Sequence, residues 1–139
     1  MPGSDVMSFV DRVVFNFLIG NADAHAKHFS ILYKKGNAGI APLYDLLSTA
    51  VYPNLSPRMA MSIGGAWEFA DVGVRSFDAF AVKCDVNPKF VRGRIDRLLS
   101  NLPSAMNEVT EELSDTGHHS PVFRAIMDQS QQRAGQLRE

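Results

Sequence analysis

Apolar residues recur at spacings of three and four along the first twenty positions of the chain. The series follows Ser4 and Asp5, which are good helix caps, and consists of Val6, Phe9, Val10, Val13, Phe17 and Leu18. This spacing predicts a core-facing helix over about residues 5–19. Gly20 and Asn21 supply its stop, because glycine readily adopts the left-handed conformation in which helices end.

Two short apolar runs separated by glycines follow a polar stretch. The predicted elements are a strand over 29–33, a turn over 34–39 and a returning strand over 40–43. A hairpin with nearly equal arms brings its two ends together. We therefore expect Tyr44 and Asp45 to lie beside Lys27 and His28, so that Asp45 is delivered to the same place as Asp23.

The remainder of the chain has a mainly helical pattern. The expected elements are a short helical turn from Leu46, an extended piece over 58–63 ending at Gly64 and Gly65, a helix capped by Ser76, a helix opened by Asn87 and Pro88, and a last helix from Ser120 and Pro121. Pro103 should kink or end the second of these helices, which continues over 105–113. The tail over 129–139 is polar and is expected to fray.

The length of 139 residues suits one domain, with 45% apolar and 21% charged residues. We divide residues 1–139 into a helix (4–20), a polar loop with its hairpin (21–45), a helical bundle (75–128) and a polar tail (129–139). The predicted fold class is therefore mostly α with a small β-hairpin.

The charge balance restricts the partners of this domain. Lys and Arg number 14 against 15 Asp and Glu, a formal net charge of −1, so nucleic-acid binding is disfavoured as a main task. The single cysteine, Cys84, cannot form an internal disulfide and is expected to be buried on its helix. There is no secretory leader and no apolar run near the ~20 residues needed to span a bilayer, so we expect a soluble, cytoplasmic protein without membrane contact.

Polar side chains gather directly after the first helix. Five of them fall within eight positions: Asn21, Asp23, His25, Lys27 and His28. Phosphoryl transfer to a hydroxyl needs a carboxylate to orient and deprotonate the hydroxyl, a cation on the transferred phosphate, and ligands for magnesium. These roles can be filled, in that order, by Asp23, Lys27, and His28 with Asp45.

Three blocks of sequence, in this order, resemble the C-terminal part of the HipA-like serine/threonine kinases. They are Gly20-Asn21-Ala22-Asp23-Ala24-His25-Ala26-Lys27-His28-Phe29, then Ala41-Pro42-Leu43-Tyr44-Asp45-Leu46-Leu47-Ser48, then Met59-Ala60-Met61-Ser62-Ile63-Gly64-Gly65. The resemblance implies the helical C-terminal lobe of a protein-kinase-like fold, in which the hairpin carries the catalytic and metal loops.

The resemblance also implies roles for individual residues. Asp23 matches the catalytic aspartate, Asp45 matches the magnesium aspartate, and His25 and Lys27 match basic positions of the catalytic loop. His28 stands where the family usually has asparagine as a second metal ligand. Because magnesium prefers hard oxygen donors, an imidazole there is a poor substitute.

Cofactors and partners follow from the same resemblance. They are ATP, Mg²⁺, a protein substrate with a Ser or Thr hydroxyl, and a DNA-binding antitoxin that would make any contact with DNA. Such kinases also carry a strand-rich N-terminal lobe, which nothing before Ser4 supplies. We therefore expect the chain to be an isolated C-terminal lobe with negligible kinase activity of its own.

Two other functions remain open from the residues. One is a non-catalytic, pseudokinase-like interaction module, favoured by the histidine at position 28 and the absent N-terminal lobe. The other is a transition-metal hydrolase built on Asp23, His25, His28 and Asp45, because imidazoles and carboxylates suit zinc, manganese or iron. The spacing of three between the histidines permits chelation if the loop is helical.

Overall fold

The computed structural model describes residues 3–138. Its α-helices are α1 (Gly3–Ile19), α2 (Val74–Lys83), α3 (Pro88–Asp115) and α4 (Pro121–Gln136). Its strands are β1 (Ile31–Lys34), β2 (Asn37–Ile40), β3 (Arg58–Ile63) and β4 (Ala66–Glu68), and its 3-10 turns are η1 (Ala26–His28), η2 (Thr49–Val51) and η3 (Phe69–Asp71). The expected mostly helical fold class is confirmed.

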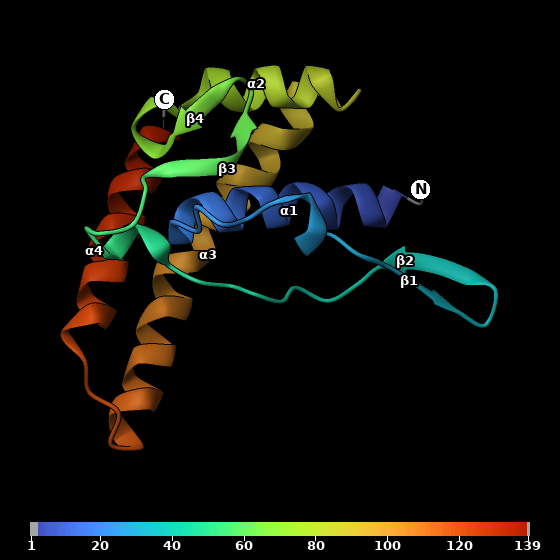
Figure 1. Ribbon diagram of the computed structural model, residues 1–139. Coiled ribbons are helices and arrows are strands. Elements are labelled where there is room, and N and C mark those ends of the chain that lie inside the picture. The colour runs from blue at the N-terminus through green and yellow to red at the C-terminus, as the bar shows by residue number, and fades with distance from the viewer. Residues whose placement is uncertain (1–2, 139) are drawn as a thin grey trace.

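Helix α1 occupies the centre of the molecule, in contact with both α3 and α4 (Figure 1). The periodic apolar positions of its sequence face one continuous core. Fully buried members of that core include Val10, Val14, Phe17, Leu18, Phe77 and Val91. Beside this core, the half-buried side chain of Arg94 on α3 pairs with that of Asp11 on α1. Among residues 3–138, no helix has both the length and the apolar character needed to cross a bilayer.

The predicted end of the first helix is confirmed. Gly20 has φ +74°, and the Gly20 and Asn21 amides turn back to donate to the carbonyls of Phe17 and Asn16. A Cβ at position 20 would lie 2.7 Å from the Arg133 Nη2 and 2.8 Å from the Ala50 Cβ. Glycine is therefore required here both for the left-handed backbone and for the close approach of two other segments.

The predicted hairpin forms, with a shorter turn than expected. Strands β1 and β2 pair antiparallel from Ile31 opposite Ile40 to Lys34 opposite Asn37. The turn is therefore Lys35-Gly36, both with positive φ, instead of the six residues 34–39. A two-residue turn of this kind matches the twist of the strands, which explains why pairing extends to it. Figure 1 shows the hairpin projecting away from the helices.

Two predicted helix starts are misplaced: the cap of α2 and the helical turn that follows the β1–β2 hairpin. Helix α2 is capped by Gly73, and Ser76 instead lies inside its first turn, where the Ser76 Oγ accepts a hydrogen bond from the Gly73 amide. The helical turn expected from Leu46 begins three residues later, at η2, and residues 46–48 have no regular secondary structure.

Strand β3 agrees with the predicted extended piece, but its partner β4 was not predicted. Three residues, Ala66 to Glu68, are too short for a periodic signal. The helix capped by Asn87 and the helix capped by Ser120 begin where predicted, with each side chain accepting from an amide two residues on. Helix α3 continues through Pro103 to Asp115, so Pro103 does not end it.

The expectation that the polar tail frays is wrong for residues 129–137. Helix α4 continues to Gln136, and Ser130, Arg133, Ala134 and Leu137 are buried. Residue 139 lies outside the described residues. The prediction of a buried Cys84 is also wrong: the thiol follows the last residue of α2 and is exposed.

Candidate functional site

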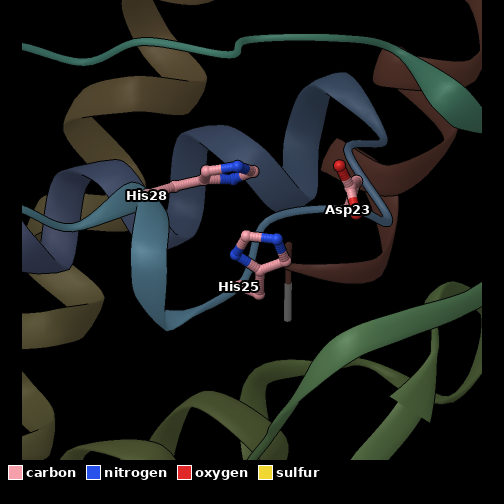
Figure 2. A group of neighbouring side chains, drawn as sticks. All are labelled: Asp23, His25 and His28. Atoms are coloured by element: carbon pink, nitrogen blue, oxygen red, sulfur yellow. The ribbon is translucent and has the colours of Figure 1, made fainter.

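The polar loop after α1 contains one turn of 3-10 helix. His25 precedes η1 and His28 is its last residue. Since side chains three residues apart lie above one another in a 3-10 helix, both imidazoles project to the same side. Their ring centroids are 4.0 Å apart, and Asp23, which is exposed, lies close enough for one ligand atom of each of the three residues to fall within 4.8 Å of the others (Figure 2).

Asp45 reaches this loop across the hairpin, as predicted. The His28 Nε2 is 3.4 Å from the Asp45 Oδ2, and the Tyr44 hydroxyl donates to the Lys27 carbonyl at 2.6 Å. Asp45 has φ +52°, a left-handed conformation that aspartate tolerates better than most residues. This backbone does not suit an N-cap, and residues 45–48 are not helical, so capping does not explain Asp45.

Asn21 ties the two acidic segments together. Its side chain is buried, and its Oδ1 accepts from the Asp23 amide at 3.2 Å. Its Nδ2 donates to the Asp45 carbonyl at 3.1 Å and to the Asn16 Oδ1 at 2.8 Å. From the sequence, Asn21 was expected to end the first helix, with a substrate-facing role as the alternative, because nothing local reveals that it fixes the backbone of both Asp23 and Asp45.

Thr49 is a second fixing residue that sequence reasoning missed. The Thr49 Oγ1 accepts from the Ala22 amide at 2.8 Å and donates to the Gly20 carbonyl at 3.2 Å. The Ala60 amide on β3 also donates to the Ala22 carbonyl at 2.7 Å. The backbone before Asp23 is thus held from two sides, by segments 27 or more residues away in the chain.

Replacing Asn21 with alanine is expected to lower the free energy of unfolding by about 1–3 kcal/mol, because it leaves buried hydrogen-bonding groups unpaired. Asn101→Ala is the matched control, since that asparagine is exposed on α3 and bonds only within its own helix. Its effect should stay within about 0.5 kcal/mol. Urea denaturation measures both, and equal effects would contradict the bracing role of Asn21.

The two basic positions of the loop have different surroundings. Lys27 is exposed, and only its carbonyl, through Tyr44, is held by a side chain. The Nδ1 atoms of His25 and His28 are both buried and find no hydrogen-bond partner among the described residues. The structure therefore brings Asp23, His25 and Asp45 to His28, and the Nδ1 atoms of both histidines are without a hydrogen-bond partner among the described residues.

An open hollow of about 400 Å³ lies beside Asp23. Its wall is formed by the loop, by η2, by the start of β3 and by the segment before that strand, through Ala22, Thr49, Leu55, Ser56, Arg58 and Ala60. The Arg58 guanidinium stacks over the Trp67 ring at 4.3 Å from its centroid. A molecule that approaches the Asp23 carboxylate from this side meets a hydroxyl and a cation.

Two kinds of sequence comparison identify relatives of this chain. The family model of the HipA-like C-terminal domain matches residues 1–106. Y4mE of Sinorhizobium fredii, named as a candidate kinase, is 45% identical over 114 residues, which are 82% of this chain and 27% of that protein. The serine/threonine-protein kinase toxin HipA of Shewanella oneidensis is 28% identical over 108 residues, 78% of this chain and 25% of that protein.

A solved structure shares the fold. The structure of HipA from Shewanella oneidensis MR-1, in complex with HipB and its operator DNA, matches 94% of this chain and 30% of that chain, with a TM-score of 0.79 and 22% identity. The chain spans about a quarter of the length of the relatives named above. On the match of the family model and these relatives, the chain belongs to the family of HipA-like C-terminal domains.

Proposed function

We propose that this chain is the catalytic lobe of a protein kinase that transfers the γ-phosphate of ATP to a serine or threonine hydroxyl. The observation that carries the proposal is the convergence of two acidic segments: Asn21 bonds the backbone of both Asp23 and Asp45, and His28 lies beside each carboxylate. The names of the relatives as kinases support the same reaction class.

In this proposal Asp23 orients the substrate hydroxyl and accepts its proton. The exposed carboxylate opens onto the hollow lined by Ser56 and Arg58, which leaves room for a protein segment carrying that hydroxyl. Lys27 is exposed on η1 within the loop and supplies a cation for phosphate. Fixed charges of this kind are most of what a protein contributes to phosphoryl transfer.

The donor set suits magnesium only in part. The Asp45 carboxylate is exposed and offers the oxygen ligands that Mg²⁺ prefers, with phosphate oxygens and water to complete its shell. The His28 imidazole is a poor magnesium ligand, and its Nε2 faces Asp45 instead. We therefore assign magnesium to Asp45. The bound ion would neutralise charge on the phosphates.

Titration with Mg·ATP, followed by amide chemical shifts, tests this assignment. The chain is expected to respond weakly, with shifts confined to residues 21–28 and 44–48, and Asp45→Asn should weaken the response at least about 10-fold. Asp85→Asn is the matched control, because Asp85 is also exposed with a positive φ but lies between α2 and α3.

Two outcomes would contradict the assignment. An unchanged response in Asp45→Asn would remove Asp45 as the magnesium ligand. No saturable response in the wild-type chain would favour the alternative function, a non-catalytic pseudokinase-like module, which the imidazole facing Asp45 also favours. Turnover by the isolated chain is expected to be negligible, because the resemblance implies that an N-terminal lobe grips the nucleotide.

We also propose a DNA-binding antitoxin as partner. The solved HipA structure of Shewanella oneidensis contains HipB and operator DNA. This chain has a net charge of −1, which provides no general attraction to a phosphate backbone. Any contact with DNA would therefore come through the partner.

A further inference from the structure

The two histidines of the polar loop each have a ring nitrogen without a partner. The Nδ1 atoms of His25 and His28 are buried and make no hydrogen bond within the described residues. A buried polar atom in this condition costs free energy that a bound ligand would recover. One ring nitrogen of each histidine and one carboxylate oxygen of Asp23 lie within 4.8 Å of one another, so the two rings and the carboxylate border one small volume (Figure 2).

His28 has the environment of a metal-binding histidine. In metal centres the ligating imidazole presents one nitrogen to the ion and directs the other to a carboxylate, which fixes the tautomer and the ring orientation. The Nε2 of His28 lies 3.4 Å from the Asp45 Oδ2, which leaves the unpartnered Nδ1 as the ligand atom. Asp45 is then the outer carboxylate of the site.

We propose that Asp23, His25 and His28 bind a transition-metal dication, with Zn²⁺ as its representative. Two imidazoles and one carboxylate favour zinc, cobalt or nickel over magnesium and calcium, which prefer all-oxygen shells. The three ligand atoms lie within 4.8 Å of one another, so side-chain rotations that move each atom by about 1 Å bring them to bonding distance of a shared ion. A fourth position stays open to water.

This site does not depend on the proposed kinase function, because no nucleotide takes part in it. It does have a consequence for that function. Asp23 cannot ligate zinc and deprotonate a hydroxyl at the same time. Zinc bound here would therefore compete with the hydroxyl substrate for Asp23.

Cobalt titration provides the test, since Co²⁺ bound by protein nitrogen and oxygen ligands has visible ligand-field absorption. The titration uses a Cys84→Ser background, because that exposed thiol is itself a possible ligand. We expect one Co²⁺ per chain. His25→Ala and His28→Asn should each weaken its binding at least about 10-fold. His118→Ala, in the exposed loop between α3 and α4, should leave binding unchanged.

Imidazole proton spectra of the unsubstituted histidines give an independent readout that needs no variant to fold. Stoichiometric Co²⁺ should shift or broaden the His25 and His28 signals and spare those of His118 and His119. Equal broadening of all four signals, or full affinity in His28→Asn, would overturn the site. Cobalt binding without any Mg·ATP response would instead count against the proposed magnesium-nucleotide site of this chain and leave the transition-metal site standing.

Discussion

Replacing Arg133 with alanine is expected to lower the free energy of unfolding by about 2–4 kcal/mol. The side chain is only 6% exposed, although it lies in the polar C-terminal part of α4. Its Nε donates to the carbonyl of Leu18 at 2.9 Å, and its guanidinium carbon lies 5.4 Å from the centre of the Phe69 ring. The substitution would remove these contacts and leave a cavity.

The Leu18 carbonyl explains why a buried arginine is retained. It lies in the last turn of α1, where carbonyls have no partner within the helix. The amides of Gly20 and Asn21 serve the carbonyls of Phe17 and Asn16, so Arg133 completes the same cap and places a cation at the negative end of the helix. Burying the charged guanidinium is unfavourable in itself, and this desolvation lowers the pKa of Arg133 to about 10.

Arg124→Ala is the matched control on the same helix. Arg124 is exposed and pairs only with Asp128 one turn away, so its loss should change stability by at most about 0.5 kcal/mol. Urea denaturation followed by far-ultraviolet circular dichroism measures both variants. Equal destabilisation by the two substitutions would mean that Arg133 contributes no more than a surface ion pair, and would contradict its role in capping α1.

Features encoded within a few residues were predictable from the sequence. Gly20 ends α1, Asn87 and Ser120 cap α3 and α4, and the hairpin brings Tyr44 and Asp45 to Lys27 and His28. In each case the physical cause is local: a left-handed glycine, a side-chain oxygen accepting from a nearby amide, or an antiparallel pair closing on itself.

Features that depend on distant residues were not predictable in this way. The polarity of residues 129–137 suggested fraying, because a single window does not show that Arg133 will meet the end of α1, 115 residues earlier. Thr49 is likewise unremarkable in sequence, yet it bonds both Gly20 and Ala22. Such contacts follow from the packing of complete elements, which the pattern of one element does not specify.

The candidate site lies between these two cases. The three sequence blocks indicated Asp23, His25, Lys27, His28 and Asp45, and the hairpin argument correctly joined the two acidic segments. What the sequence did not show is the state of each side chain: two unpartnered ring nitrogens, and Asp45 facing the imidazole at position 28. These details are the basis of the proposed transition-metal site.

Gly64→Ala is expected to lower the free energy of unfolding by about 3–5 kcal/mol. Gly64 has φ +59° in the turn between β3 and β4, and an added Cβ would lie 2.0 Å from the carbonyl oxygen of Ser76. That oxygen belongs to the backbone of α2, so it cannot move aside as a flexible side chain would. The variant must combine a strained backbone with displacement of either the β3–β4 turn or helix α2.

Gly65→Ala separates these two causes. Gly65 also has positive φ, +99°, but a Cβ there would meet no atom within 4 Å, so only backbone strain of about 1–2 kcal/mol is expected. Guanidinium denaturation of both variants gives the difference, which measures the clash with α2. If Gly64→Ala costs no more than Gly65→Ala, the β3–β4 turn is not packed against α2 as described. If Gly64→Ala is the more destabilising variant, we also expect it to disturb the backbone at Asp23. The reason is that the Ala60 amide on β3 donates to the Ala22 carbonyl, directly before Asp23.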